Sequence, residues 1–254
     1  MKISLLQASL IALFYYLSWS PFLSYISFFT WNRPLVAGLV TGIILGQPLE
    51  GAIIGASINL IYLGFISAGG AQMGDPAFAG YVGTAIALAA DMDVKAAMAI
   101  AVPLGTIATI LWISKMTVNT FFVHMADKKA EEGNTKAISF INIVPCQLFL
   151  FAVSFIPTLL VVYFGPSAVD GLFKLFGPRV LHTFEVIGGM LPALGIAMNL
   201  KVIGNSFTMP FFILGLILAV TFNVDLITIA ILGTIAAFII IQLKDYDSNN
   251  KMLS

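Results

Sequence analysis

The sequence predicts an all-α polytopic membrane protein, and three observations lead to that prediction. Hydrophobic residues make up 59% of the 254 positions and charged residues 9%, whereas a soluble domain carries about 25% charged residues. The mean hydropathy is +1.01. Apolar segments follow one another along the chain, with glycine and proline at their interruptions. Because lipid offers the backbone no hydrogen-bond partners, these segments are expected to be helices, in one integral-membrane domain over residues 1–254.

The charge and the motif content exclude several function classes. The 12 basic residues balance the 12 acidic ones and are scattered, so nothing indicates a nucleic-acid partner. The sequence has no phosphate-cradling Gly-Lys-Ser/Thr motif, no His-Glu-x-x-His zinc motif and no Gly-x-Ser-x-Gly nucleophile motif. Cys146 is the one cysteine, which excludes an internal disulfide. We therefore expect no metal, no cofactor and no catalytic residue on this chain.

The first apolar segment, Ile3 to Leu17, follows a positively charged start at Lys2. No small-x-small cleavage site clearly follows it, so an uncleaved membrane segment is a better interpretation than a signal peptide. Aromatic residues gather at its end and just beyond, which indicates an interfacial level in the membrane. These aromatic residues are Tyr15, Tyr16, Trp19, Tyr25 and Trp31.

The next two segments carry glycines four residues apart. Small residues at i and i+4 lie on one helix face and allow two backbones to approach closely, so tight helix packing is predicted. Leu35–Gly46 is short for a full span, which needs about 20 residues. Short segments interrupted by Gly or Pro are typical of transporter folds with discontinuous helices. The glycines are Gly38, Gly42 and Gly46, then Gly51 and Gly55.

The stretch from Ala68 to Gly80 separates two apolar segments and places three glycines before Asp75 and a proline, Pro76, after it. Asp75 stands before Pro76 and an apolar segment, which is the pattern of an N-cap followed by proline at the first helical position. Two interpretations stay open. Asp75 belongs to a broken-helix solute site in the membrane, where free backbone groups need protein or water, or it caps a helix in a polar loop outside the membrane.

Three other polar residues are expected to complete a site with Asp75. Asn59 lies within the apolar run before the interruption, and Ser67 and Gln72 lie between that run and Asp75. Amide, hydroxyl and carboxylate groups suit a neutral polyhydroxy ligand, since each sugar hydroxyl can donate to an oxygen and accept from an amide. For Asn59, an interhelical hydrogen bond is the alternative.

The longest polar stretch, His124 to Lys136, lies near the midpoint of the chain. The positive-inside rule places it in the cytoplasm. Because this stretch divides the chain near its midpoint, we interpret the chain as two pseudo-repeat halves, about 1–126 and 137–243, joined by a polar loop over 127–136. His124 is either a proton or phosphoryl relay or a surface histidine at a helix end.

The second half repeats features of the first. Gly-Gly-x-x-Pro at 188–192 parallels the Gly-Gly pair at 69–70, which Pro76 follows. Paired interruptions in corresponding halves indicate an inverted-repeat, transporter-like bundle with discontinuous or re-entrant helices. Glu185, beside the second interruption, is either functional or a helix cap.

Proline also falls inside the two long apolar segments. Pro103 lies within 96–123, and Pro145 and Pro157 lie within 137–165. Because proline removes a backbone donor and clashes with the preceding turn, we expect these segments to be broken there.

Several motifs then occur in order along nearly the whole chain. They are Leu5-Leu-Gln7, Arg33-Pro34-Leu35, Gly42-x-x-Leu-Gly46, Gly55-Ala-Ser-Ile-Asn-Leu-Ile-Tyr-Leu-Gly64, Gly69-Gly-Ala-Gln-x-x-Asp75-Pro, His124-Met-Ala-Asp-Lys, Gly188-Gly-Met-Leu-Pro192 and Met209-Pro-Phe-Phe. As a set, they resemble the enzyme IIC subunit of the mannose/fructose/sorbose/N-acetylgalactosamine family of the phosphoenolpyruvate-dependent sugar phosphotransferase system. No single motif would suffice.

The resemblance implies a multi-pass permease in the bacterial inner (cytoplasmic) membrane that binds a hexose-type sugar and moves it by an alternating-access, elevator-like motion. It implies a membrane partner, enzyme IID, with which IIC forms a trimer of heterodimers. A cytoplasmic IIA/IIB pair would then phosphorylate the sugar from a phosphohistidine. The chain itself would be a non-catalytic transport subunit with no phosphorylated residue.

The resemblance also assigns residues. Asp75 matches the acid of the family's Gly-rich interruption, and Asn59 stands where several members carry glutamate. Both would contact sugar hydroxyls, with Ser67 and Gln72 completing the shell. Because asparagine departs from that pattern, an amino sugar or a glycated amine is as plausible a substrate as mannose or glucose.

Two other classes are alternatives. An ion-coupled secondary transporter of a small polar solute would show the same kind of helix interruption. An intramembrane aspartyl protease would use Asp75 together with a second facing aspartate, since the two must share a proton. The other candidate aspartates all lie in loop-like sequence: Asp91, Asp93, Asp170 and Asp225.

Overall fold

The computed structural model describes residues 2–62, 74–176 and 203–252, with several single positions between 186 and 201. Every regular element within these residues is a helix, so the predicted all-α class is confirmed for them. The chain divides into two compact units, Met1–Asn199 and Leu200–Ser254. The predicted second interruption lies largely outside the described residues, including Glu185, Gly188, Gly189 and Pro192.

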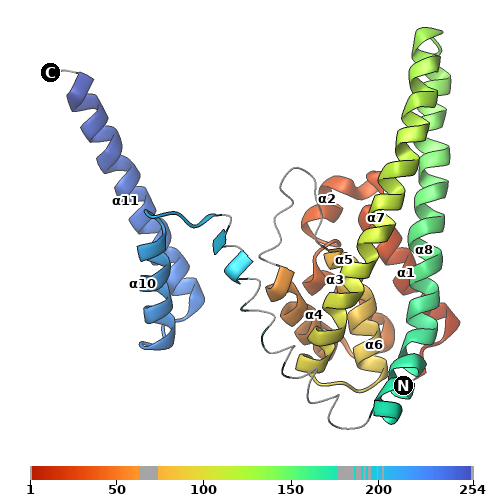
Figure 1. Cartoon of the computed structure of the whole chain (residues 1–254), viewed down its shortest axis with the longest axis horizontal. Coiled ribbons are helices and arrows are strands. Elements are labelled where there is room, and N and C mark those ends of the chain that lie inside the picture. Colours follow the sequence, from red (N-terminus) through yellow and green to blue (C-terminus); the bar gives the residue numbers. More distant parts are fainter. Residues whose placement is uncertain are drawn as a thin grey trace. The chain divides into compact units, whose positions relative to one another are not determined.

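The first unit contains two long helices and a cluster of shorter ones. In Figure 1, α7 and α8 run side by side, and the shorter helices lie against one end of this pair. The helices are α1 (Leu5–Trp19), α2 (Ser24–Phe29), α3 (Pro34–Leu45), α4 (Pro48–Tyr62), α5 (Pro76–Phe78), α6 (Thr84–Ala89), α7 (Val94–Glu131) and α8 (Thr135–Phe176), with a π-helical turn at Ala79–Gly83 between α5 and α6.

The core of this unit surrounds the helical run from α5 to α6. Every residue from Ala77 to Ala89 is buried, so this run has no solvent-facing side and lies among its neighbours, as a helix that is apolar all round must. Tyr81 and Val82 are fully buried in the π-helical turn. π-Helical turns within α-helices are frequent at functional sites.

Glycines bring α3 and α4 into backbone contact, as their spacing predicted. A Cβ atom on Gly38 would lie 2.5 Å from the carbonyl oxygen of Gly51, and one on Gly51 would lie 2.6 Å from the Cα of Gly42. Gly55 faces Gly38 in the same way. Gly46 has a different role: it ends α3 with φ +80°, a left-handed conformation that glycine adopts without a Cβ clash.

The expected breaks at proline are wrong for the long helices. α7 continues through Pro103 over 38 residues, and α8 continues through Pro145 and Pro157. Proline within a membrane helix is tolerated when neighbouring groups satisfy the freed carbonyl. α7 and the Thr135–Ala168 part of α8 are long and apolar enough to cross a membrane.

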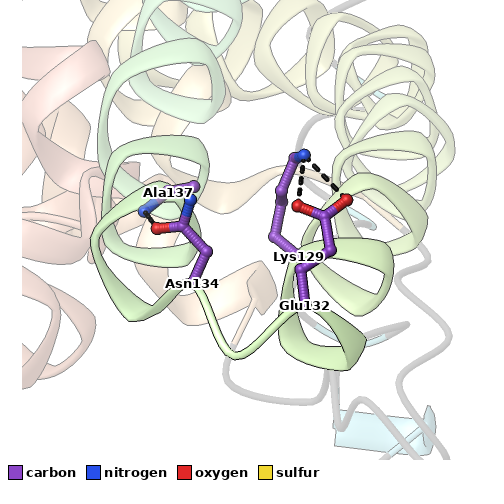
Figure 2. Close-up of polar contacts among 4 residues, drawn as sticks. All are labelled: Lys129, Glu132, Asn134 and Ala137. Atoms are coloured by element: carbon purple, nitrogen blue, oxygen red, sulfur yellow. Dashed lines mark hydrogen bonds and ion pairs between the residues drawn. The ribbon is translucent and has the colours of Figure 1, made fainter.

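The polar stretch 127–136 is mostly helical rather than a loop. α7 ends at Glu131 and α8 begins at Thr135, so the connection is short. Lys129 Nζ lies 2.7 Å from Glu132 Oε2, and the Asn134 side-chain oxygen accepts from the Ala137 N–H at 3.1 Å, capping α8 (Figure 2). The expected loop over 127–136 is therefore wrong for most of its residues.

The second unit contains α10 (Met209–Val220) and α11 (Leu226–Met252), which contact each other. Asp225 caps α11 by accepting hydrogen bonds from the Thr228 N–H at 2.6 Å and the Thr228 hydroxyl at 2.9 Å. These two bonds lower the pKa of the Asp225 carboxyl, because they favour its charged form. Asp225 is therefore a solvent-exposed helix cap.

Candidate functional site

Asp75 is a buried N-cap at the start of α5. Its Oδ1 accepts from the Phe78 N–H at 2.9 Å, and Pro76 occupies the first helical turn, so the predicted cap geometry is confirmed. The residue is 1% exposed. A buried carboxylate is costly unless hydrogen bonds satisfy it, and Asp75 is therefore more than the cap of a solvated loop.

Gly105 of α7 positions the backbone of Asp75. The Asp75 N–H donates to the Gly105 carbonyl at 2.8 Å. A Cβ atom at position 105 would lie 3.0 Å from the Asp75 carbonyl oxygen and would clash with the Tyr62 hydroxyl. Since only glycine lacks that atom, Gly105 allows the start of α5 to lie directly against α7.

Helix α1 supplies two donors to the Asp75 carboxylate. The Tyr15 hydroxyl donates to Oδ2 at 2.6 Å, and the Trp19 Nε1–H donates to the same oxygen at 3.1 Å. Tyr15 is 1% exposed, so its hydroxyl serves a buried carboxylate, and the interfacial level expected for Tyr15 and Trp19 stays a prediction. Buried Tyr and Trp need a partner for their polar atoms. The i, i+4 spacing of Tyr15 and Trp19 on an apolar helix places both side chains on one face, and this spacing could have indicated a shared polar partner.

A small cavity lies beside the Asp75 carboxylate. Its volume is about 10 Å³, which is room for one water molecule. Its walls come from α1, α7, α8 and the start of α5. The residues that line it are Tyr15, Trp19, Asp75, Leu111, Trp112, Lys115, Leu150, Val153 and Ser154.

Lys115 is the cation of this site. Its Nζ lies 5.4 Å from the Trp19 ring centroid and 5.2 Å from that of Trp112, distances that allow cation–π attraction. The two rings are 4.8 Å apart. Lys115 is not among the residues predicted from the sequence, although a lone lysine inside an apolar segment is a sign of function.

A second, larger cavity adjoins the first and shares Lys115 and Leu150 with it. Its volume is about 270 Å³. Asn119 of α7 and Asn142 and Gln147 of α8 contribute amide groups to its wall. The Gln147 Oε1 accepts from the hydroxyls of Tyr16 at 3.1 Å and Ser20 at 3.2 Å, which fixes the orientation of this amide.

The other predicted site residues are not gathered around Asp75. Asn59 is half-buried on α4 and lines neither cavity. Ser67 and Gln72 lie outside the described residues. His124 is exposed on α7, with Nδ1 3.9 Å from Asp127 Oδ2. Among the described residues, no cluster of three metal-binding side chains occurs.

The acid content of the site bears on the protease alternative. Asp75 is the only acidic residue among those described as lining the two cavities. Acid proteolysis needs a second carboxylate beside the first. The described part of the site therefore lacks the partner that this chemistry requires.

These features define an all-helical membrane protein with a polar site where an apolar helix begins. Residues 5–239 match the family model described as "PTS system sorbose-specific iic component". The mannose-specific EIIC component of Escherichia coli is 32% identical over 216 residues, which is 85% of this chain and 81% of that protein. The chain belongs to the family of IIC components of the sugar phosphotransferase system.

Solved structures agree with this assignment. One, described as the structure of a membrane protein, is 31% identical with a TM-score of 0.82, covering 95% of this chain and 97% of the other. The mannose transporter ManYZ, solved in complex with a microcin, is 32% identical with a TM-score of 0.59 and the same coverage. The predicted resemblance is confirmed, and the chain is a membrane permease component of a sugar phosphotransferase system. Neither alternative class is supported.

Proposed function

We propose that this IIC subunit binds a hexose-type sugar at Asp75 and carries it across the bacterial cytoplasmic membrane to be phosphorylated by a IIB partner. The observation that supports this most is the buried carboxylate of Asp75, held at a helix start beside a cavity. A carboxylate accepts hydrogen bonds from sugar hydroxyls. The Trp19 and Trp112 rings beside it offer flat apolar surfaces to a sugar ring.

The hydrogen bonds of Asp75 indicate how a sugar would enter. A carboxylate has about four acceptor positions. Phe78 occupies one on Oδ1, and Tyr15 and Trp19 occupy both on Oδ2. At most one position is left, and the adjoining cavity is too small for a hexose. The described conformation is therefore closed at Asp75, and sugar hydroxyls would replace the Tyr15 and Trp19 donors when α1 and α5 separate.

Residues before Asp75 would complete the binding shell. Ser67 and Gln72 precede the acid along the chain, and Asn59 lies near the end of α4. Their hydroxyl and amide groups suit the remaining sugar hydroxyls. A re-entrant segment leading from α4 to α5, paired with a second one in the other half as an inverted repeat, would place these groups at membrane depth.

The partners follow from the family. The similarity to ManYZ supports a IID membrane subunit, and we infer a trimer of IIC–IID heterodimers served by cytoplasmic IIA and IIB. Phosphoryl transfer would lie with IIB. The family model is named for sorbose and the relative from Escherichia coli for mannose, so a hexose, an amino sugar and a glycated amine are all candidate substrates.

The test is sugar uptake by cells that carry Asp75→Asn. Asparagine also caps helices well, so the helix start is preserved while the charge is removed. Loss of a charge-assisted hydrogen bond costs about 1.5–3 kcal/mol, and we expect uptake to fall at least about tenfold. The measurement is uptake of labelled hexoses, normalised to the amount of IIC in the membrane.

The matched control is Asp93→Asn. Asp93 caps α7 through the Ala96 N–H at 2.9 Å, but it is exposed and lines neither cavity. The same chemical change there should leave uptake unaltered. Uptake at the wild-type rate in a normally inserted Asp75→Asn variant would exclude Asp75 from the sugar site.

A further inference from the structure

The larger cavity has a chemical character of its own. It lies between α7, α8 and Pro21, in the short 3-10 turn that follows α1, and it adjoins the Asp75 cavity through Lys115 and Leu150. Its volume of about 270 Å³ is near the lower end of the range of about 300–1,000 Å³ for small-molecule sites. A monosaccharide derivative fits such a space better than a larger molecule.

The polar groups of this cavity are one cation and three amides. Lys115 supplies an ammonium group, and no acidic residue is among the described residues that line the cavity. Neither of the ion pairs found among the described residues involves Lys115. An ammonium between apolar walls is costly without an opposite charge, and the Trp rings compensate only part of that cost. The Asp75 carboxylate of the adjoining cavity supplies part of the opposite charge, although the two groups form none of the ion pairs found among the described residues. A ligand anion would give Lys115 a direct ion-pair partner.

Two of the amides have hydrogen-bonding groups available for ligand hydroxyls. The Asn119 Oδ1 is buried and has no hydrogen-bond partner among the described residues, and such an unsatisfied acceptor requires an explanation. The Oε1 of Gln147 is already engaged by two hydroxyls, so its two N–H donors are left for a ligand. One acceptor and several donors in the same cavity match a polyhydroxylated molecule.

We propose that this cavity is a second ligand site, which binds a polyhydroxylated ligand with one anionic group. Lys115 pairs with the anion, and Asn119 and Gln147 bond the hydroxyls. Two sources would supply this chemistry: a sugar phosphate, which is the product of phosphorylation by the partner, or a sugar acid that is itself transported. The sugar phosphate as a ligand rests on the proposed function. The second site itself is argued from the residues that line the cavity.

The experiment is equilibrium binding to the purified complex of this chain with its IID partner, using hexose 6-phosphate and hexuronate as probes. We expect Lys115→Met to weaken binding of the anionic probe at least about tenfold, the effect of losing a charge-assisted hydrogen bond. Lys115→Arg retains the charge and should remain within about threefold of wild type. Lys95→Met, on the exposed start of the same helix, should change nothing.

The probes separate the two sources. Binding that depends on Lys115 for hexose 6-phosphate alone identifies a product site, and dependence for hexuronate identifies a carboxylated substrate. Inorganic phosphate is the third probe. If inorganic phosphate binds as tightly as hexose 6-phosphate, the amides do not contribute to recognition of the sugar hydroxyls, and the proposal is overturned. Equal binding by wild type and Lys115→Met, or no binding of either anionic sugar, overturns it as well.

A second variant guards against misfolding of Lys115→Met. Asn119→Leu removes the unsatisfied amide and should weaken both anionic sugars without changing inorganic phosphate binding. Neutral hexose binding is measured in parallel with Asp75→Asn. If neutral hexose binds Asp75→Asn as tightly as wild type, the proposed function at Asp75 fails. The response of anionic sugars to Asn119→Leu still decides the second site, because Asn119 lines the larger cavity and not the one beside Asp75.

Discussion

Asp75 connects two parts of the chain through its two carboxylate oxygens. Oδ1 holds the start of α5, and Oδ2 holds α1 through Tyr15 and Trp19. Because sugar hydroxyls would compete with Tyr15 and Trp19 for Oδ2, these two donors stabilise the closed, sugar-free state. If Asp75 binds the sugar as proposed, ligand affinity there would be reduced by the cost of breaking these two bonds.

Tyr15→Phe tests this competition. The substitution removes only the hydroxyl that donates to Oδ2 at 2.6 Å, so the closed state loses a hydrogen bond to a charged group, worth about 1.5–3 kcal/mol. We expect tighter sugar binding, with the Kd lowered by about tenfold or more. The measurement is a labelled-sugar titration of the purified IIC–IID complex.

Tyr16→Phe is the control, because the neighbouring hydroxyl bonds Gln147 rather than Asp75. The affinity of the Tyr16→Phe complex for neutral sugar should equal that of wild type. Weaker binding by Tyr15→Phe would show that Tyr15 stays bonded in the sugar complex and does not compete with the ligand.

At this scale the sequence predicts some residues and not others. Asp75 was predictable because an acid before proline and an apolar segment is a local pattern. Its donors were not, since Tyr15 lies 60 positions away and an aromatic residue near a helix end is equally typical of a membrane interface. The places of Ser67 and Gln72 remain predictions.

Among the elements, the contact between α3 and α4 depends most directly on side-chain size. Their glycines face each other with backbone atoms in contact. Backbone cannot move aside as a flexible side chain can, so an added methyl group must push the two helices apart. This contact positions α4, which packs against α7.

Gly51→Ala should therefore destabilise the protein. The new Cβ would lie 2.5 Å from the Gly38 carbonyl oxygen, and overpacking of this kind costs about 1–3 kcal/mol. The measurement is the free energy of unfolding of the purified protein in detergent. Gly233→Ala is the control, since nothing lies within 4 Å of an added Cβ there; it should stabilise α11 by about 0.5–1 kcal/mol. Equal effects of the two substitutions would contradict close packing of α3 on α4.

Element boundaries show where local patterns stop being informative. The glycine spacing predicted the α3–α4 contact, because i, i+4 spacing fixes a helix face. Proline spacing did not predict breaks in α7 and α8, because neighbouring groups, rather than the local sequence, decide whether a helix continues through proline. The turn between α7 and α8 is shorter than 127–136 since Lys129, Glu132 and Asn134 support helix ends (Figure 2).

In the first unit as a whole, a buried central helix begins at the carboxylate that a sugar would contact. α5 and α6 lie among the other helices of this unit (Figure 1). α7 and α8 line both cavities, and α1 lines the one beside Asp75. Opening the Asp75 site therefore means moving α1 relative to α5 rather than rotating one side chain. Composition and motif order were enough to predict the membrane class and the family. The two adjoining cavities, which share Lys115 as a lining residue, could not be predicted, because helices far apart in the sequence form them.

The most direct test is equilibrium binding of labelled hexoses to the purified IIC–IID complex, which separates sugar recognition from phosphoryl transfer. We expect saturable binding by wild type and by Asp93→Asn, and binding by Asp75→Asn that is at least about tenfold weaker. Wild-type affinity in a folded Asp75→Asn complex would contradict the assignment of Asp75 as the group that binds the sugar.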